Sequence, residues 1–147
     1  MNTSVKIKKL SENAILPKYG TEFAAGADLY ALCDSPVSIA PGESKLIHTG
    51  IAMAIPEGLV GLIFARSGLA TKQGLAPANK VGVIDSDYRG EIMVCLYNQS
   101  NQTRVVENGD RIAQISLIPY YTANYELCDD LDSTDRGEGG FGSTGVK

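Results

Sequence analysis

An acidic turn that directly follows an apolar run is the densest candidate for chemistry in this sequence. The segment Gly82–Glu91 reads GVIDSDYRGE, which predicts a short strand, a tight polar connection and a second strand, and therefore a hairpin. Asp85 would be held at the end of the first strand, where a fixed carboxylate can accept a proton from an attacking water. The alternative is an Asx-type turn that carries surface charges, and the local sequence alone favours that alternative.

A guanidinium and a hydroxyl stand side by side at the start of the one helix that the pattern predicts. Arg66 precedes Ser67, which has an N-cap-like position in a helix expected from Ser67 to about Lys72, with Gly74 placed to end it. Free amides at a helix start, a hydroxyl and a guanidinium together make an anion site. The alternative is that Ser67 only caps its helix and Arg66 is solvated, and the two interpretations are evenly matched.

The C-terminal stretch is rich in glycine. Residues 136–145 read RGEGGFGSTG, and successive glycine amides can converge on phosphate oxygens as a nest. This is not a Walker loop, because no Lys-Ser/Thr pair and no helix follow it. Phe141 is a lone aromatic residue that could cover the flat face of a nucleobase, a contact that contributes roughly 1–3 kcal/mol. The alternative is a disordered linker with one stray aromatic residue.

Few other side chains offer chemistry. Asp28 follows small residues and could help to hold Mg²⁺, which keeps several waters and uses few protein ligands, although an ordinary turn or strand-end Asp is the commoner case. His48 is the only histidine, so a His-based triad or a multi-His metal site would need sharing across subunits, and we expect a structural role. An enzyme with this inventory must use carboxylates, hydroxyls, arginines and backbone amides, which suit phosphoryl chemistry.

Short strands must position these groups. Apolar alternation or short apolar runs predict strands at Val5–Lys8, Val37–Ile39, Leu46–Ile47, Ile51–Ile55, Leu59–Phe64, Ile92–Tyr97 and Arg111–Ile118. In the last of these, Ala113, Ile115 and Leu117 would share one face. Turn signals at spacings of roughly 8–12 residues predict an all-β sandwich or barrel. Large apolar residues nearly vanish from Asp129 onward, so we expect a domain over residues 1–128 and a mobile, flexible Gly-rich tail over residues 129–147.

Bulk properties narrow the class of function. The length of 147 residues and the apolar content of 44% suit one soluble domain. The net charge of −4 argues against a general grip on nucleic acid, which needs a basic face. Cys33, Cys95 and Cys128 are far apart and odd in number, so reduced thiols in a cytoplasmic protein are the simplest interpretation. No secretory h-region begins the chain, and no apolar run approaches the roughly 18 residues that span a membrane.

Five segments in this order resemble the five motifs of the trimeric dUTPase family. They are AGADLYA at 25–31, ARSGLA at 65–70, GVIDSDYRGEI at 82–92, GDRIAQI at 109–115 and RGEGGFGSTG at 136–145. Each motif alone is weak, but five in register across nearly the whole chain are specific. The departures are small: Ala65 stands where the family often has proline, and Glu22 and Phe23 are larger than usual before the first motif.

The resemblance implies a jelly-roll-like β fold assembled as a homotrimer, with active sites that use residues from more than one subunit. It implies a dUTP diphosphatase, which hydrolyses dUTP to dUMP and pyrophosphate with Mg²⁺. Asp85 would be the general base for the water that attacks the α-phosphorus, and Asp28 would hold Mg²⁺ through a coordinated water. Gln114 would contact phosphate and help to order the nucleophile.

The same resemblance implies the substrate contacts. The phosphate pocket would contain Arg66, Ser67 and Gly68, and the uracil edge would be read inside the hairpin by Asn79, Gly82 and Val83. Tyr88 would pack under the deoxyribose and exclude a 2′-hydroxyl. A neighbouring subunit's tail would supply Phe141 to cover the uracil, and the phosphates would be closed in by Arg136, Gly142, Ser143 and Thr144. We expect Arg111 to be structural, as an ion pair at the subunit interface.

Two other classes of protein compete with this interpretation. A dCTP deaminase has a related fold but needs a catalytic Glu, whereas this chain carries Asp85 and Tyr88 in the pyrophosphatase pattern. A non-catalytic trimeric module that binds a partner protein should have lost motif residues. The motif residues are all present here: Asp28, Ser67, Asp85, Gln114, Arg136 and Phe141.

Overall fold

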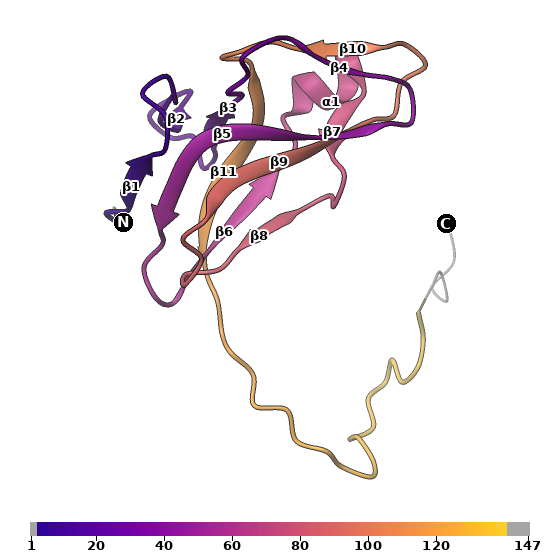
Figure 1. The fold of residues 1–147 in the computed structure, drawn as a ribbon. Helices are drawn as coiled ribbons and strands as arrows, with labels where there is room; N and C mark the ends of the chain where they lie inside the picture. The colour runs from indigo at the N-terminus through magenta and orange to yellow at the C-terminus, as the bar shows by residue number, and fades with distance from the viewer. Residues whose placement is uncertain (1–2, 141–147) are drawn as a thin grey trace.

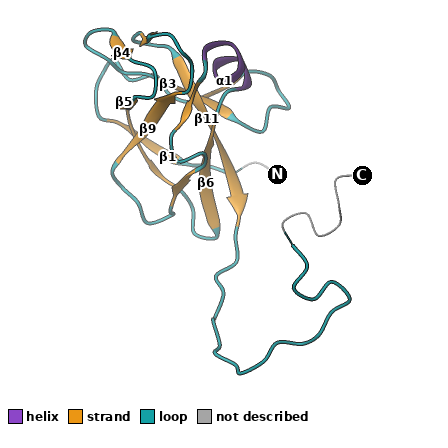
Figure 2. Cartoon of the chain, turned by 90° about the vertical axis from the view of Figure 1, so that its right-hand side faces the viewer, coloured by secondary structure: helices purple, strands orange, loops and turns teal. Residues whose placement is uncertain are grey.

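The computed structural model describes residues 3–140 and shows two antiparallel sheets that pack face to face, with one short helix in this range (Figures 1 and 2). The first sheet consists, in order, of β1 (Lys6–Lys9), β5 (Ser44–Ala54), β9 (Glu91–Asn98) and β7 (Leu75–Pro77). The second consists of β2 (Lys18–Tyr19), β3 (Ala27–Tyr30), β11 (Arg111–Pro119), β6 (Leu59–Phe64) and β8 (Gly82–Ile84). A separate pair is formed by β10 (Arg104–Val106) and β4 (Val37–Ile39). The predicted all-β, jelly-roll-type fold is confirmed.

The core lies between the two larger sheets because each sheet turns one apolar face inward. In β9, Ile92, Val94 and Leu96 are buried, and the residues between them are half-exposed, which is the two-residue period of a strand. The second sheet adds Leu29 and Ile115 among its buried residues. Full burial of such a side chain stabilises the fold by roughly 1.5–3 kcal/mol, so the core holds the strand register that positions the polar groups.

Irregularities in two strands were not predicted. Leu46–Ile47 and Ile51–Ile55 were expected as separate strands, but residues 44–54 form the single strand β5, whose register with β9 shifts between His48 and Ala52. In β11 the register shifts between Arg111 and Ala113, so Ile112 and Ala113 are both buried. The predicted face of Ala113, Ile115 and Leu117 agrees with the burial of this strand, and the shift adds Ile112 to the buried residues.

The predicted hairpin over Gly82–Glu91 is wrong. β8 pairs with β6 in the five-stranded sheet, whereas β9 pairs with β5 and β7 in the four-stranded sheet. Residues 85–90 therefore cross from one sheet to the other, and Asp85 stands at the beginning of the crossing. A turn signal between two apolar runs shows where the chain reverses but does not show which strands pair.

The predicted helix is confirmed as α1 (Ser67–Gln73), but its N-cap is Arg66 and not Ser67. Arg66 has an extended backbone and makes no side-chain cap hydrogen bond, so Ser67 is the first helical residue. At the other end Gly74 adopts the left-handed conformation, with φ of 69°, and its N–H donates to the Ala70 carbonyl. Glycine ends the helix as the sequence predicted, because it enters this region without a Cβ clash.

His48 pairs with Glu91 beside the irregular part of β5. His48 Nδ1 lies 2.9 Å from Glu91 Oε2, and the Gly50 N–H donates to Glu91 Oε1 at 2.8 Å. Burial raises the pKa of the Glu91 carboxyl, but the hydrogen bonds from His48 and Gly50 outweigh it and leave that pKa below its ordinary value. The ionised carboxylate therefore stabilises the fold at neutral pH and loses this effect in acid, which agrees with a structural role for His48.

The three cysteines are free, as the sequence predicted. Burial, together with the nearby carboxylates of Asp110 and Asp34, raises the pKa of the Cys33 thiol. A thiol with a raised pKa stays protonated near neutral pH and is a poor nucleophile. Cysteine chemistry at Cys33 is therefore not a feature of the site described below.

After Pro119 the chain leaves the sandwich and runs away from it (Figures 1 and 2). Between residues 120 and 140 the structure shows no helix or strand, and large apolar side chains are almost fully exposed at Tyr121, Tyr125 and Leu127. The division of the chain at residue 128 stays a prediction. Among the described residues, 3–140, no helix is long and apolar enough to cross a membrane.

Candidate active site

The outer side of the five-stranded sheet carries a carboxylate held by two arginines. Asp28 alternates in β3 with the buried Ala27 and Leu29, and its side chain is 13% exposed. Arg66 Nε donates to Asp28 Oδ1 at 2.8 Å, and Arg111 Nη1 donates to Asp28 Oδ2 at 3.4 Å. Two guanidiniums around one carboxylate make this cluster net positive, although the chain as a whole carries a net charge of −4.

Strand pairing brings the first, second and fourth motif segments to this place. Asp28 is opposite Gln114 on β11, and Gln114 is opposite Phe64 on β6. Residues directly opposite on neighbouring strands share one face of the sheet, so the chain that leaves β6 delivers Arg66 beside Asp28. Gln114 Nε2 donates to the Ala65 carbonyl at 2.9 Å, which fastens the loop between β6 and α1 to β11.

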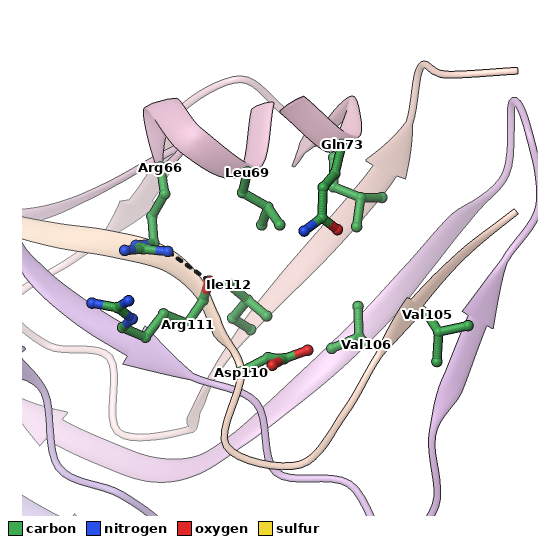
Figure 3. Close-up of a pocket in the computed structure, with 9 residues that line it drawn as sticks. Arg66, Leu69, Gln73, Val105, Val106, Asp110, Arg111 and Ile112 are labelled. Carbon is green, nitrogen blue, oxygen red and sulfur yellow. Dashed lines mark hydrogen bonds between the residues drawn. The ribbon is translucent and has the colours of Figure 1, made fainter. Parts of the chain in front are cut away.

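A second hydrogen bond fixes the plane of the Arg66 guanidinium. Its Nη1 donates to the Arg111 carbonyl at 3.3 Å, as the dashed line in Figure 3 shows. Both arginines lie at one end of a hollow between α1 and the segment that enters β11, with Leu69 and Ile112 among the residues that line it. Asp28 and the Arg111 carbonyl use Nε and one N–H of Nη1, so the other Nη N–H groups are the donors that could bind an anion.

Gly26 makes room for the Gln114 side chain. A Cβ at Gly26 would lie 2.5 Å from Oε1 and 3.1 Å from Cδ of Gln114, which is closer than non-bonded carbon contacts allow. Any larger residue at this position would displace the Gln114 amide or the strand. A positioning role for Gly26 was not predicted, although a glycine between two alanines just before Asp28 was a usable signal.

Asp85 lies apart from the arginine cluster. Ile84 is opposite Gly61 on β6, so Asp85 comes level with Val60, whereas Arg66 lies beyond Phe64 at the other end of β6. At about 3.3 Å per residue, four strand residues alone separate the two places by roughly 13 Å. One chain therefore holds the two sets of candidate groups at opposite ends of the same strand.

The Asp85 carboxylate belongs to an exposed hollow on the surface. The hollow is lined by Ile55, Glu57, Asp85, Ser86, Asp87, Arg89 and Tyr120. The turn bond runs from the Tyr88 N–H to the Asp85 backbone carbonyl at 3.2 Å, so the turn is closed by the backbone of Asp85 and not by its carboxylate. The turn is therefore not an Asx turn at Asp85, and the carboxylate remains exposed at the surface.

Tyr88 folds back over its own turn. Its hydroxyl donates to the Glu91 carbonyl at 3.0 Å, and a Cβ at Gly90 would overlap the ring. Arg89 Nη1 donates to the Tyr88 carbonyl at 2.9 Å. These bonds hold the crossing between β8 and β9 in one conformation, and they leave Tyr88 41% exposed.

The candidates for base recognition surround the turn before β8. Asn79 is exposed, and its Nδ2 lies 3.6 Å from the point where a Gly82 Cβ would stand. Gly82 is buried against Ile63 of β6, and Val83 is 59% exposed. Asn79 and Gly82 are therefore neighbours in space, as recognition of one base edge requires.

The structure describes only some of the remaining candidate residues. Ser67 and Gly68 are exposed at the beginning of α1. Arg136 Nε donates to the Gly139 carbonyl at 2.8 Å within the C-terminal segment. Four residues predicted to contact substrate lie outside the described residues: Phe141, Gly142, Ser143 and Thr144.

The donor set does not form a metal cage. Within residues 3–140, no group of three or more His, Cys, Asp or Glu side chains could hold a metal ion. Asp28 is a single carboxylate whose oxygens already accept from Arg66 and Arg111. This set fits Mg²⁺ that is coordinated mainly by phosphates and waters and reaches the protein through one outer contact.

Comparison with known proteins identifies the family. The dUTPase family model matches residues 12–145, which is nearly the whole chain. The chain belongs to the dUTPase family. Relatives of this dUTPase named deoxyuridine 5'-triphosphate nucleotidohydrolase include one from Desulfitobacterium hafniense, 55% identical over 132 residues that cover 89% of this chain and 87% of the relative. Another, from Shewanella sp. strain W3-18-1, is 45% identical over 152 residues that cover both chains completely.

Solved dUTPase structures share the fold. A mutant dUTPase of Staphylococcus bacteriophage 80alpha with dUpNHpp has a TM-score of 0.85 and 29% identity, and the match covers 99% of this chain and 100% of that one. A mutant dUTPase from phage phi11 of S. aureus, which reveals the coordination of a structural Mg(II) ion, has a TM-score of 0.80 and 26% identity over 89% of this chain and 100% of that one. The resemblance is confirmed, and this dUTPase is a hydrolase.

We expect Gly26→Ala to lower the dUTPase kcat/KM by about 100-fold if Gln114 acts in the site as predicted, because a displacement of about 1 Å in an active site can have an effect of that size. The added methyl group would push the Gln114 amide away from the Ala65 carbonyl. Pyrophosphate release measures the effect. Gly20→Ala is the matched control, since a Cβ at Gly20 meets nothing within 4 Å. Equal rates in the two variants would show that the position of Gln114 is not critical.

Proposed function

We propose that this chain hydrolyses dUTP to dUMP and pyrophosphate through attack of water on the α-phosphorus, assisted by Mg²⁺, as a homotrimer in the cytoplasm. The observation that carries the proposal is the separation along β6 of the Arg66 cluster from Asp85. This separation supports a site built where copies of the chain meet, with the arginines from one copy and the carboxylate from another. The reaction would limit uracil in DNA and supply dUMP for dTMP synthesis.

Asp85 is the proposed general base. It stands at the end of a paired strand in a turn closed by its own backbone carbonyl, so its backbone is fixed, and its exposed carboxylate lines the surface hollow. There it would take the proton from water as the oxygen bonds to the α-phosphorus and pyrophosphate leaves. General bases of this kind contribute roughly 10²–10⁴-fold to rate.

Gln114 and the first residues of α1 are the proposed contacts to the phosphates. One N–H of the Gln114 amide is used by the Ala65 carbonyl, and the second N–H can donate to a phosphate oxygen or to the attacking water. The Ser67 hydroxyl and the Gly68 amide lie one and two residues after Arg66, at the exposed beginning of α1. Together they would surround the triphosphate on the side of the arginine cluster.

Charge must be balanced locally. A nucleoside triphosphate of about −4 charge is repelled by a chain of net charge −4 unless local cations offset the field. Arg66 and Arg111 supply positive charge at Asp28, and Arg136 would arrive from a neighbouring tail. Mg²⁺, when bound, neutralises charge that develops on the phosphates, and Asp28 would hold it through a coordinated water.

Base and sugar selection would use the two turns that flank β8. Asn79, Gly82 and Val83 would read the uracil edge, and the Tyr88 ring, fixed by its bond to the Glu91 carbonyl, would pack under the deoxyribose and exclude a 2′-hydroxyl. The C-terminal segment extends away from its own sandwich (Figure 2). This course supports a tail that closes over a neighbouring subunit's site, with Phe141 on the uracil and Gly142, Ser143 and Thr144 on the phosphates.

Asp85→Asn should lower kcat for dUTP by about 10²–10⁴-fold and leave dUTP binding largely intact, because the amide keeps the shape of the side chain but accepts no proton. Pyrophosphate release and equilibrium binding of dUTP measure the two effects. Glu57→Gln is the matched control, since Glu57 lines the same hollow and should be dispensable. Wild-type turnover in Asp85→Asn would refute the assignment of the base.

The wild-type chain should release pyrophosphate from dUTP in Mg²⁺ and far less from dTTP, dCTP and UTP. Excess EDTA should suppress turnover, and added Mg²⁺ should restore it, because uncompensated phosphate charge opposes both binding and reaction. Ammonia release is measured in parallel. Ammonia from dCTP without pyrophosphate from dUTP would favour a deaminase, and full hydrolysis of dUTP in EDTA would refute the role of the metal.

Deletion of residues 135–147 should remove most turnover and leave the unfolding temperature and the subunit number unchanged. The deleted residues that the structure describes lie outside both sheets, so the core loses no packing, whereas the site loses its cover and admits water. Turnover, thermal unfolding and light scattering give the three readouts. Full turnover in the truncated protein would contradict the closing tail, and loss of the folded sandwich would place the tail in the core.

A further inference from the structure

The turn between β7 and β8 holds a residue with a Cβ in the left-handed region. Lys80 has a φ of +66°, and every other residue with positive φ in the described part of the chain is glycine. This conformation brings the Cβ too close to the following carbonyl oxygen, so it is disfavoured for lysine. The surrounding structure must therefore hold Lys80 in place.

Two short-range hydrogen bonds define the turn. The Lys80 N–H donates to the Pro77 carbonyl at 3.0 Å, and the Val81 N–H donates to the Asn79 carbonyl at 2.7 Å. The second bond joins residues two apart across a residue of positive φ, which is the rarer and more strained form of γ-turn. Lys80 is the central residue of this γ-turn.

The γ-turn lies in the short connection between β7 and β8, and each of these strands is held in a different sheet. Pro77 belongs to β7 in the four-stranded sheet and Gly82 to β8 in the five-stranded sheet, so no strand pairing joins the two arms of the turn. A Cβ at Gly82 would already lie 3.2 Å from the Ile63 Cβ on one side and 3.6 Å from the Asn79 amide nitrogen on the other. How closely Asn79 approaches Gly82 therefore depends on the backbone of Lys80.

We infer that Lys80 is a positioning residue for base selection and that it acts through its backbone conformation, not through its ammonium group. The γ-turn holds Asn79 and Gly82 as a stiff edge that takes a uracil ring and leaves no room for a 5-methyl group. The inference rests on the proposed function. A stiff edge is needed because a yielding pocket separates substrates that differ by one methyl group by only about 10–200-fold.

A series of substitutions at Lys80 separates conformation from charge. Glycine adopts positive φ freely, alanine meets the same Cβ clash as lysine without the charge, and β-branched valine resists this conformation most. Lys80→Val should lower the preference for dUTP over dTTP in kcat/KM by about tenfold, mainly through a higher KM for dUTP, because the edge shifts. Lys80→Gly and Lys80→Ala should keep the wild-type preference.

The outcomes are distinguishable. An unchanged preference in folded Lys80→Val overturns the inference, and so does an equal loss in Lys80→Ala, which would assign the effect to the ammonium group. Lys80→Thr, with a smaller β-branched side chain, takes the place of valine if that variant does not fold. A wild-type chain inactive on dUTP would overturn the proposed function itself. If the wild type is active and selective but all Lys80 variants keep the same preference for dUTP over dTTP, only the inference is overturned.

Discussion

The ion pair between Asp28 and Arg66 joins parts of the chain that are 38 residues apart, and the proposed phosphate side of the site depends on it. Asp28 is fixed by β3, Arg66 by the end of β6, and Arg111 by the start of β11. The pair is partly buried, so its loss should cost more than the roughly 0–1 kcal/mol of an exposed pair. Without Asp28, two guanidiniums would face each other without a counter-charge.

The strand register places Gln114 beside the ion pair of Asp28 and Arg66. Gln114 occupies the position between Asp28 and Phe64 across three neighbouring strands, and Gly26 leaves the volume that its amide fills. The buried apolar faces set that register, because a slip by one residue would turn every core side chain toward solvent. The hydrophobic core therefore determines the geometry of polar groups that it does not touch.

The sequence predicted most of what local pattern encodes. Apolar runs located β1, β6 and β9, and Gly74 marked the end of α1. What it missed was non-local: the continuity of β5 through a register shift, the assignment of β8 and β9 to different sheets, and the ion pair between Asp28 and Arg111 within one chain. Pairing partners depend on the whole topology, which turn residues and alternation do not specify. Local chemistry pointed to Asp28 and Arg66 and the resemblance added Gln114, but only the register shows why the three meet.

The position of Asp85 and Arg66 at opposite ends of β6 has a genetic consequence. Under the proposed assembly, each site takes Asp85 from one chain and Arg66 from another. A substitution of Asp85 and a substitution of Arg66 therefore inactivate different halves of a site. When both variants are made in one cell, mixed oligomers contain some sites that draw each half from an intact chain. Two alleles that are inactive alone would therefore complement each other, which two lesions in a site confined to one chain cannot do.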